Sequence, residues 1–202
     1  MRKKCSRCKT DVLEQLLDIN GFCIRCQKSL REAEENRKPY DQKESITEYL
    51  SKLDDWLKEN RPDFYSHLQP PATEQELLSF EKKIGQIIPQ AFKDLYKWKN
   101  GQKGTVVSFF QNYMFLPLSD VEDYWSDLST MAKAGEFDSE NWWKKEWIPF
   151  LSNGGGDLLC LNLSLANPGT LIEFWHANED RDIVHKTMSK MMQEFLKDPE
   201  PY

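Results

Sequence analysis

Four cysteines near the start of the chain have the spacing of a metal site. Two residues separate Cys5 from Cys8, fourteen residues follow, and Cys23 and Cys26 repeat the first spacing. Such a gap lets each pair form a knuckle, and two knuckles complete a tetrahedral shell of four sulfurs around one ion. Four thiolates leave no open position for water or substrate, so we expect one structural zinc (Zn2+) and no catalysis here.

The segment between the two cysteine pairs favours a compact finger. Asn20-Gly21 suits a tight turn just before the second pair, which predicts a zinc ribbon or a treble-clef-like finger. About 30 residues bury too little surface to fold alone, so the metal would supply most of the stability. Two disulfides or an iron–sulfur cluster are the alternatives; a reducing compartment disfavours the first and the spacing disfavours the second.

The fifth cysteine and the histidines do not indicate an active site. Cys160 lies among leucines and is expected to be an inert core residue of a strand. His67, His176 and His185 form no spacing typical of a catalytic metal; His176 could lie near Glu173, as a structural pair.

Other catalytic patterns are also missing from the sequence. The glycine run between Asn153 and Asp157 precedes a predicted strand and lacks the Lys-Ser/Thr of a phosphate loop, so we interpret it as a turn between strands. The chain has no nucleophile elbow and no helical His-Glu-x-x-His pair. We therefore expect a protein that is not an enzyme.

Two adjacent tryptophans and the three acidic residues before them are candidates for partner binding, within a segment, 120–146, that we predict faces the partner. Trp142 and Trp143 follow Glu136, Asp138 and Glu140, and neighbouring residues in a loop are not easily both buried. We predict that one of them is exposed as an anchor, because Trp is enriched at binding hot spots. The alternative is that both cover one end of the core. The tryptophans expected in the core are Trp98, Trp125, Trp147 and Trp175.

Charge divides the chain into a basic tip and an acidic body. Of the 202 residues, 1–38 hold ten Lys/Arg and six Asp/Glu, whereas 39–202 hold 17 and 27. Residues 120–146 alone hold eight acidic and three basic side chains. An acidic surface repels nucleic acid and membranes but attracts basic partners. We predict a finger with a charged linker at 1–38 and one domain at 39–202.

The N-terminus indicates a cytoplasmic protein. It has no apolar stretch typical of a signal peptide, and no segment approaches 18 uninterrupted apolar residues. Hydrophobic residues make up 39% of the chain, which is enough to form a globular core.

Helix signals dominate the first part of the body and recur in its middle. Capping boxes at Ser45–Glu48, Thr73–Glu76 and Ser119–Glu122 each predict a helix start, and Pro89 predicts another. Helix ends are predicted at Arg61-Pro62, Asn100-Gly101 and Gly135.

Strand signals follow in the second half. Residues 105–110 and 113–118 predict a hairpin turning at Gln111-Asn112, and residues 147–151, 158–163 and 170–176 predict consecutive antiparallel strands. A closing amphipathic segment at 188–196 can pack on this sheet. The order of elements predicts an α+β body.

Several of these segments resemble the SUKH superfamily, which includes the yeast cell-wall assembly regulator. The resemblance covers about residues 46–198 and is carried by five stretches: the helix from Thr73 to Gly85, Ile88-Pro89, Asn100-Gly101-Gln102, Trp147-Ile148-Pro149-Phe150, and Gly154 to Leu163 with the Pro168-Gly169 turn. Asn162 departs from the pattern, which has Asp there. The four-cysteine finger is not part of it.

The resemblance implies a SUKH-like antiparallel sheet packed with helices and a protein that binds other proteins. Bacterial members are typically immunity proteins that bind and neutralise a toxin domain, and fungal members regulate cell-wall synthesis. We expect an immunity protein for a basic toxin domain, such as a nuclease. The alternative is a regulatory adaptor in which the finger contacts nucleic acid or a protein; its modest basic surplus favours a protein.

Overall fold

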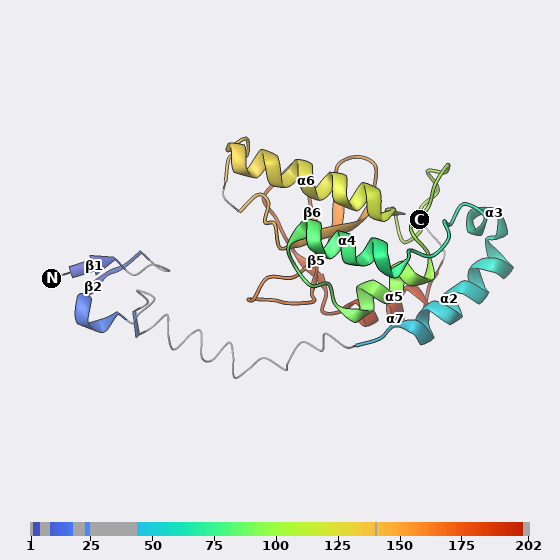
Figure 1. Cartoon of the computed structure of the whole chain (residues 1–202), viewed down its shortest axis with the longest axis horizontal. Helices are drawn as coiled ribbons and strands as arrows, with labels where there is room; N and C mark the ends of the chain where they lie inside the picture. The colour runs from blue at the N-terminus through green and yellow to red at the C-terminus, as the bar shows by residue number, and fades with distance from the viewer. Residues whose placement is uncertain (1, 5–8, 18–22, 25–43, 140, 200–202) are drawn as a thin grey trace. The chain divides into compact units, whose positions relative to one another are not determined.

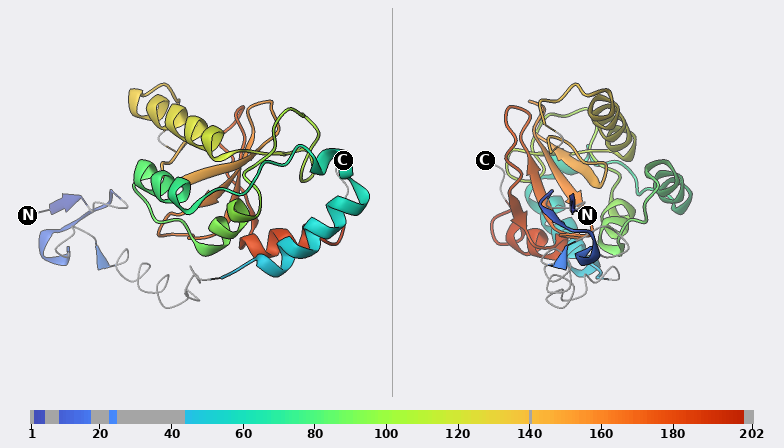
Figure 2. Two further views of the ribbon diagram at one scale, coloured as in Figure 1. Left: turned by 45° about the vertical axis from the view of Figure 1, so that its right-hand side comes forward. Right: turned by 90° about the vertical axis from the view of Figure 1, so that its left-hand side faces the viewer.

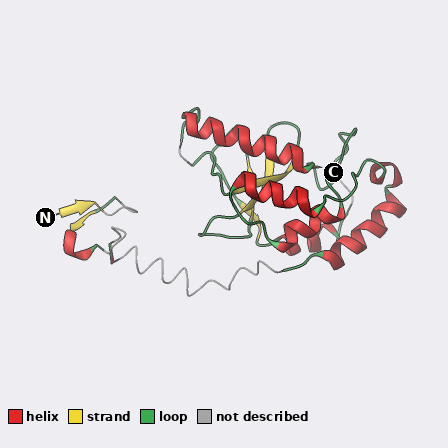
Figure 3. Cartoon of the chain, in the orientation of Figure 1, coloured by secondary structure: helices red, strands yellow, loops and turns green. Residues whose placement is uncertain are grey.

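The computed structural model describes residues 2–4, 9–17, 23–24, 44–139 and 141–199. The chain divides into two compact units, Met1–Tyr40 and Asp41–Tyr202 (Figure 1). The second unit combines helices with a sheet (Figure 3). No helix in these described ranges has both the length and the apolarity needed to span a bilayer.

The first unit contains a small hairpin. Its elements are β1 (Arg2–Lys4), β2 (Asp11–Leu13) and the short 3-10 helix η1 (Glu14–Leu16). The strands are antiparallel, with Lys4 opposite Asp11, and they flank the segment that holds Cys5 and Cys8 in the sequence. Leu17 forms a β-bridge with Cys23, whose side chain is buried.

The second unit contains six helices and five strands in its described residues. In chain order they are α2 (Thr47–Asn60), α3 (Pro62–Tyr65), α4 (Glu74–Ile84), α5 (Gln90–Trp98), β3 (Met114–Phe115), α6 (Leu118–Ala134), β4 (Trp147–Ser152), β5 (Leu158–Asn162), β6 (Leu171–Phe174), β7 (Ile183–His185) and α7 (Met188–Phe195). The strands pair in the order β3-β4-β5-β6-β7, each antiparallel to its neighbour. The predicted α+β class is confirmed.

The sheet is buried on both faces. Because side chains alternate along a strand, its residues divide between two apolar clusters. The larger cluster receives Ile148, Leu151, Leu159, Leu161 and Leu171, together with residues of α2, α4, α5 and α7. The smaller receives Trp147, Leu158, Cys160, Ile172 and Phe174, and residues of α6 pack against it. Figure 2 shows the sheet between α6 (yellow) on one side and α2 (cyan) and α7 (red) on the other.

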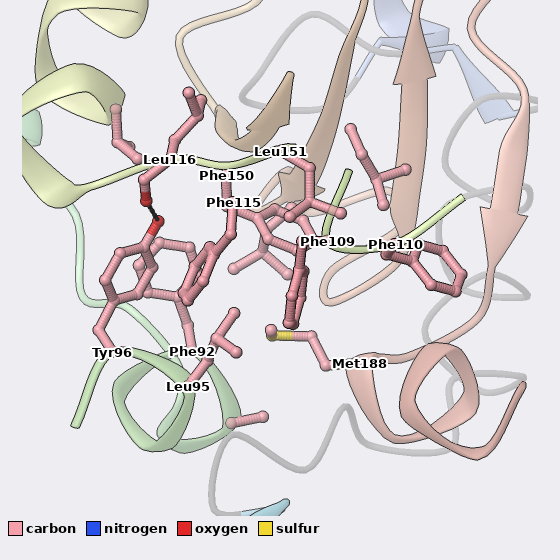
Figure 4. Packing of buried hydrophobic residues seen from close by; sticks show 14 of the residues in the cluster. Phe92, Leu95, Tyr96, Phe109, Phe110, Phe115, Leu116, Phe150, Leu151 and Met188 are labelled. Carbon is pink, nitrogen blue, oxygen red and sulfur yellow. Dashed lines mark hydrogen bonds between the residues drawn. The ribbon is translucent and has the colours of Figure 1, made fainter. Parts of the chain in front are cut away.

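Aromatic side chains fill the larger cluster. The Phe92 and Tyr96 rings of α5 are 4.7 Å apart, and Tyr96 lies 5.3 Å from Phe115 of β3 (Figure 4). The buried Tyr96 hydroxyl donates a 3.0 Å hydrogen bond to the Leu116 carbonyl oxygen, which compensates for its removal from water. Each such buried side chain contributes about 2 kcal/mol by leaving water.

One of the three predicted capping boxes is confirmed. At α4 the Thr73 side chain accepts a hydrogen bond from the Glu76 N–H, and the Glu76 carboxylate accepts one from the Thr73 N–H. The box at Ser45 is wrong, because the Ser45 hydroxyl donates to Asp94 of α5 at 2.6 Å. The predicted start at Ser119 is also wrong: α6 begins at Leu118, whose N–H donates to the Asn100 side chain.

The predicted hairpin over residues 105–118 is confirmed only at its turn and at β3, which lies within the predicted second strand. Phe110 and Tyr113 form a β-bridge around Gln111, but β3 pairs with β4 instead of with residues 105–110. The carbonyl oxygens of this segment accept hydrogen bonds from side chains, since Arg61 donates to Ser108 and Gln102 to Val107. These side-chain hydrogen bonds satisfy backbone carbonyl oxygens that a neighbouring strand would otherwise bind.

The three later strands and the closing helix are confirmed, with ends one to two residues from those expected. The glycine run is the turn between β4 and β5, where the Asn153 N–H donates to the Asp157 carbonyl oxygen. Strand β7 and helix α3 are not predicted by the sequence patterns.

Candidate interaction surface

Helix α6 carries three exposed aspartates that form no ion pair within the described residues. Asp120, Asp123 and Asp127 follow at three- and four-residue spacing, which places them on one face of a helix. Tyr124 lies among them, and the four side chains line a hollow of about 200 Å³. We call these four residues the α6 acidic face.

The carboxylates of this face are available to a partner. No ion pair involves them within the part of the chain that the structure describes; Asp120 accepts a 2.9 Å hydrogen bond from Ser119. Glu122, by contrast, is paired with Lys83 of α4 at 2.6 Å. The α6 acidic face therefore carries negative charge that forms no ion pair within the described residues.

A larger hollow adjoins this face. It measures about 350 Å³ and shares Asp120 and Tyr124 with the smaller hollow. Residues Gln102 to Thr105 of the loop between α5 and β3 also line it, and β3 contributes Met114 and Phe115. A third hollow of about 360 Å³ lies between α4 and α6. The start of α6 is thus a grooved acidic surface.

Trp143 is not an exposed anchor. It is 4% exposed, and its ring makes edge-to-face contacts with Trp147 and Phe174 at 5.9 and 5.5 Å. Its indole N–H donates to the Ser129 hydroxyl at 3.1 Å. The prediction for Trp143 as a contact residue is therefore corrected, because its side chain fills the smaller core cluster.

Trp142 is half-buried, and its ring stacks on that of Phe137 with 6.0 Å between the ring centroids. Glu136 and Asp138 are exposed beyond the C-terminal end of α6, and Glu140 lies outside the described residues. Among the predicted core tryptophans, Trp147 is buried and Trp98 and Trp125 are half-buried, but Trp175 is exposed. Part of the predicted partner segment therefore remains accessible to a partner.

Arg181 fixes this segment in place, and the sequence patterns did not identify it. Its Nε and Nη2 donate to the Trp142 carbonyl oxygen at 3.2 and 2.8 Å, and its Nη1 donates to the Asn178 carbonyl oxygen at 2.8 Å. Its guanidinium lies 4.4 Å from the Phe174 ring centroid. The segment preceding β7 thereby holds the loop between α6 and β4.

His176 pairs with Asp157, not with Glu173. Its ring Nδ1 lies 2.8 Å from the Asp157 carboxylate, which also accepts hydrogen bonds from the His176 N–H and the Asn153 side chain. Burial raises the pKa of Asp157, but the bonds from His176 and Asn153 outweigh it and hold this pKa below its usual range. Asp157 is fully occupied in closing the turn and is unsuited to proton transfer.

A second polar pair joins Glu173 of β6 to Tyr113, just before β3. Glu173 accepts a hydrogen bond from the Tyr113 hydroxyl. His185 is buried nearby, and its Nδ1 lies 3.3 Å from the Glu194 carboxylate of α7. Burial lowers the pKa of His185, partly offset by Glu194 and Glu173. These contacts tie β6, β7 and α7 together.

Cys160 and Asn162 have structural surroundings. Cys160 is 0% exposed, and burial raises the pKa of its thiol, so the prediction of an inert core cysteine is confirmed. The Asn162 side-chain oxygen accepts a 2.9 Å hydrogen bond from the Ser164 N–H. Asn therefore makes this turn contact without a carboxylate.

Three of the four predicted zinc ligands, Cys5, Cys8 and Cys26, lie outside the described residues. Cys23 is described, and Val12 and Leu17 pack against it. Within the described ranges, no three His, Cys, Asp or Glu side chains gather as a metal site would require.

The family of the chain follows from its match to a family model. The model of the SMI1 / KNR4 family (SUKH-1) matches residues 71–194, more than half of the chain. This range includes α4 to α6, the whole five-stranded sheet and all of α7 except Phe195, and with them the α6 acidic face. A search among curated proteins gives no significant match. The chain belongs to the SMI1/KNR4 (SUKH-1) family.

Proposed function

We propose that this chain is a non-enzymatic immunity-type protein that binds a basic toxin domain through the α6 acidic face. The observation that carries the proposal is the row of Asp120, Asp123 and Asp127, which form no ion pairs in the described chain and border a hollow beside Tyr124. Exposed carboxylates of one sign speed encounter with a positively charged partner. A nuclease is such a partner, since it must bind a polyanion.

Membership of the SUKH-1 family supports this proposal, because the bacterial relatives that the sequence resembles are immunity proteins. Occluding a basic active site with carboxylates requires no catalytic group. A structural role for the described polar pairs is consistent with a non-enzymatic function. Asp157 bonds His176, and Tyr113 bonds Glu173, so both pairs connect parts of the same domain.

For the N-terminal unit we propose one structural zinc, held by Cys5, Cys8, Cys23 and Cys26. The hairpin of β1 and β2 supports this, because it flanks the first cysteine pair, and the Leu17–Cys23 bridge includes the first cysteine of the second pair. The thiolate donors suit zinc chemically. We further propose that residues 1–38 and 39–202 fold independently, in a cytoplasmic protein.

Affinity capture from the native host tests the proposed function. The baits are the full chain and its triple variant Asp120→Asn/Asp123→Asn/Asp127→Asn, and captured proteins are quantified by mass spectrometry. The matched control replaces three exposed acids elsewhere: Glu59→Gln/Asp63→Asn/Glu179→Gln. We expect a basic protein on the wild type and the control that is at least tenfold depleted on the α6 variant.

Growth measurements complete this test. Expressing the captured protein alone in a heterologous host should stop growth, and co-expressing the full chain should restore it. Equal capture by the α6 variant would contradict the proposed face. A captured protein that is harmless when expressed alone would contradict the immunity function.

A further inference from the structure

The loop between α5 and β3 presents two apolar side chains to solvent. Val106 is 85% exposed and Val107 is 49% exposed. Single exposed apolar residues are normal on protein surfaces. Here two β-branched residues are adjacent in the loop between α5 and β3, which projects from the body (Figure 1); we call this pair the Val106-Val107 tip.

This loop is held by side chains from three other positions. Gln102 donates through Nε2 to the Thr105 and Val107 carbonyl oxygens at 3.3 and 2.9 Å, and its own oxygen accepts the Phe115 N–H at 2.9 Å. Arg61 donates to the Ser108 carbonyl oxygen at 2.7 Å.

The third position is His67, whose Nδ1 lies 3.0 Å from the Lys103 carbonyl oxygen. This oxygen only accepts, so Nδ1 carries the proton of the pair. Because the carbonyl oxygens of Lys103, Thr105, Val107 and Ser108 are all engaged, the valines are presented by an ordered backbone. An ordered loop loses little conformational entropy when it binds.

The loop and the α6 acidic face border the same hollow. Lys103, Gly104 and Thr105 of the loop line the 350 Å³ hollow together with Asp120 and Tyr124 of α6. Val106 follows Thr105 directly. The exposed valines therefore directly follow the part of the loop that lines a hollow together with residues of the α6 acidic face.

We propose that the Val106-Val107 tip is the second contact element for the partner of the α6 acidic face. The partner it fits is a basic protein that carries an apolar patch beside its Lys and Arg side chains. The carboxylates complement that positive charge and set the rate of encounter, whereas the valines are desolvated on contact and set the lifetime of the complex. This inference rests on the proposed function.

Photo-crosslinking in the native host tests the contact. The photoreactive residue p-benzoylphenylalanine replaces Val106, Thr130 on α6, or Leu165, which is 80% exposed in the turn between β5 and β6. We expect Val106 and Thr130 to crosslink to the same basic protein and Leu165 to give none. All three positions are exposed, so the replacements should leave the fold intact.

The outcomes separate this inference from the proposed function. Crosslinking from Thr130 without crosslinking from Val106 overturns the inference and leaves the α6 acidic face standing. Crosslinking from Val106 alone, or from neither position, overturns both. Equal crosslinking from Leu165 also overturns the inference, because the contact would then be non-specific.

Binding kinetics with the crosslinked protein give a second measurement. Val106→Ser/Val107→Ser should speed dissociation about tenfold and leave the association rate within about twofold. The control Leu165→Ser/Ile87→Ser removes two apolar side chains of similar or greater exposure and should change neither rate. An unchanged dissociation rate for the valine variant would overturn the inference.

Discussion

Arg181 donates two hydrogen bonds, from Nε and Nη2, to the carbonyl oxygen of Trp142, 39 residues earlier in the chain. The same guanidinium lies 5.7 Å from the Trp142 ring centroid and 5.9 Å from that of Trp147. One side chain thus fixes the loop that joins α6 to β4. This contact joins the segment before β7 to the loop between α6 and β4, which Trp125 and Gln86 also contact through the Lys145 carbonyl oxygen.

Replacing Arg181 with Lys should destabilise the body. An ammonium lacks the planar fork that donates twice to one oxygen, so we expect a loss of about 1–3 kcal/mol in the free energy of unfolding. Urea unfolding measures it, and Lys133→Ala on exposed α6 should change stability by less than about 0.5 kcal/mol. Equal stabilities for Arg181→Lys and wild type would show that this contact is dispensable.

Asp157→Asn should weaken the β4–β5 turn in a pH-dependent way. The carboxylate accepts three hydrogen bonds, so the variant should lose about 1–3 kcal/mol at pH 7. The folded-state pKa of Asp157 lies below the unfolded value of about 3.9, so this stability is present above pH 4 and is lost as pH falls through the folded pKa.

The difference in the free energy of unfolding between wild type and Asp157→Asn should therefore be smaller at pH 3 than at pH 7. Urea unfolding curves at the two pH values measure it. Asp123→Asn, on the exposed face of α6, should have the same free energy of unfolding as wild type at both pH values. If Asp157→Asn lost the same free energy of unfolding at pH 3 as at pH 7, the charge of Asp157 would not contribute to the stability of the turn.

The two adjacent tryptophans should respond differently to truncation. Trp143→Ala removes a ring that is 4% exposed and packed on Trp147 and Phe174, so about 3–5 kcal/mol of stability should be lost. Trp142→Ala removes a half-buried ring and should lower the stability clearly less than Trp143→Ala does. Thermal unfolding distinguishes them, and the reverse order would contradict the burial described here.

Purified protein should carry one zinc per chain, because two knuckles close a tetrahedral shell. Elemental analysis measures the stoichiometry, and Cys23→Ser should reduce it. Treatment with a chelator should leave the urea unfolding of residues 39–202 unchanged if the two units are independent. Substoichiometric zinc in protein made without chelator, or bound iron with visible absorbance, would contradict the zinc assignment.

Local signals in the sequence predicted the elements whose contacts are local. The Thr73–Glu76 box forms as predicted because both partners belong to one turn. The same pattern fails at Ser45, where Asp94 from another helix accepts the hydroxyl proton. Strand β7 has three residues, and only its pairing with β6 defines it. A motif therefore predicts structure only where no distant group competes for its atoms.

The candidate surface shows the same division. The charge excess of residues 120–146 is visible in composition, and helical spacing brings Asp120, Asp123 and Asp127 together. Sequence could not decide which of Trp142 and Trp143 is buried, because Ser129 and Phe174 determine it from other elements. Arg181 was missed for the same reason.

The association rate of the captured basic partner, measured as a function of salt, tests the central claim most directly. For wild type we expect fast association that slows as salt screens the carboxylates. Asp120→Asn/Asp123→Asn/Asp127→Asn should slow association about tenfold or more at low salt and flatten the salt dependence, with a smaller effect on dissociation. Glu59→Gln/Asp63→Asn/Glu179→Gln should keep the wild-type behaviour. Identical association rates for the α6 variant and wild type at low salt would contradict the claim that the partner meets α6.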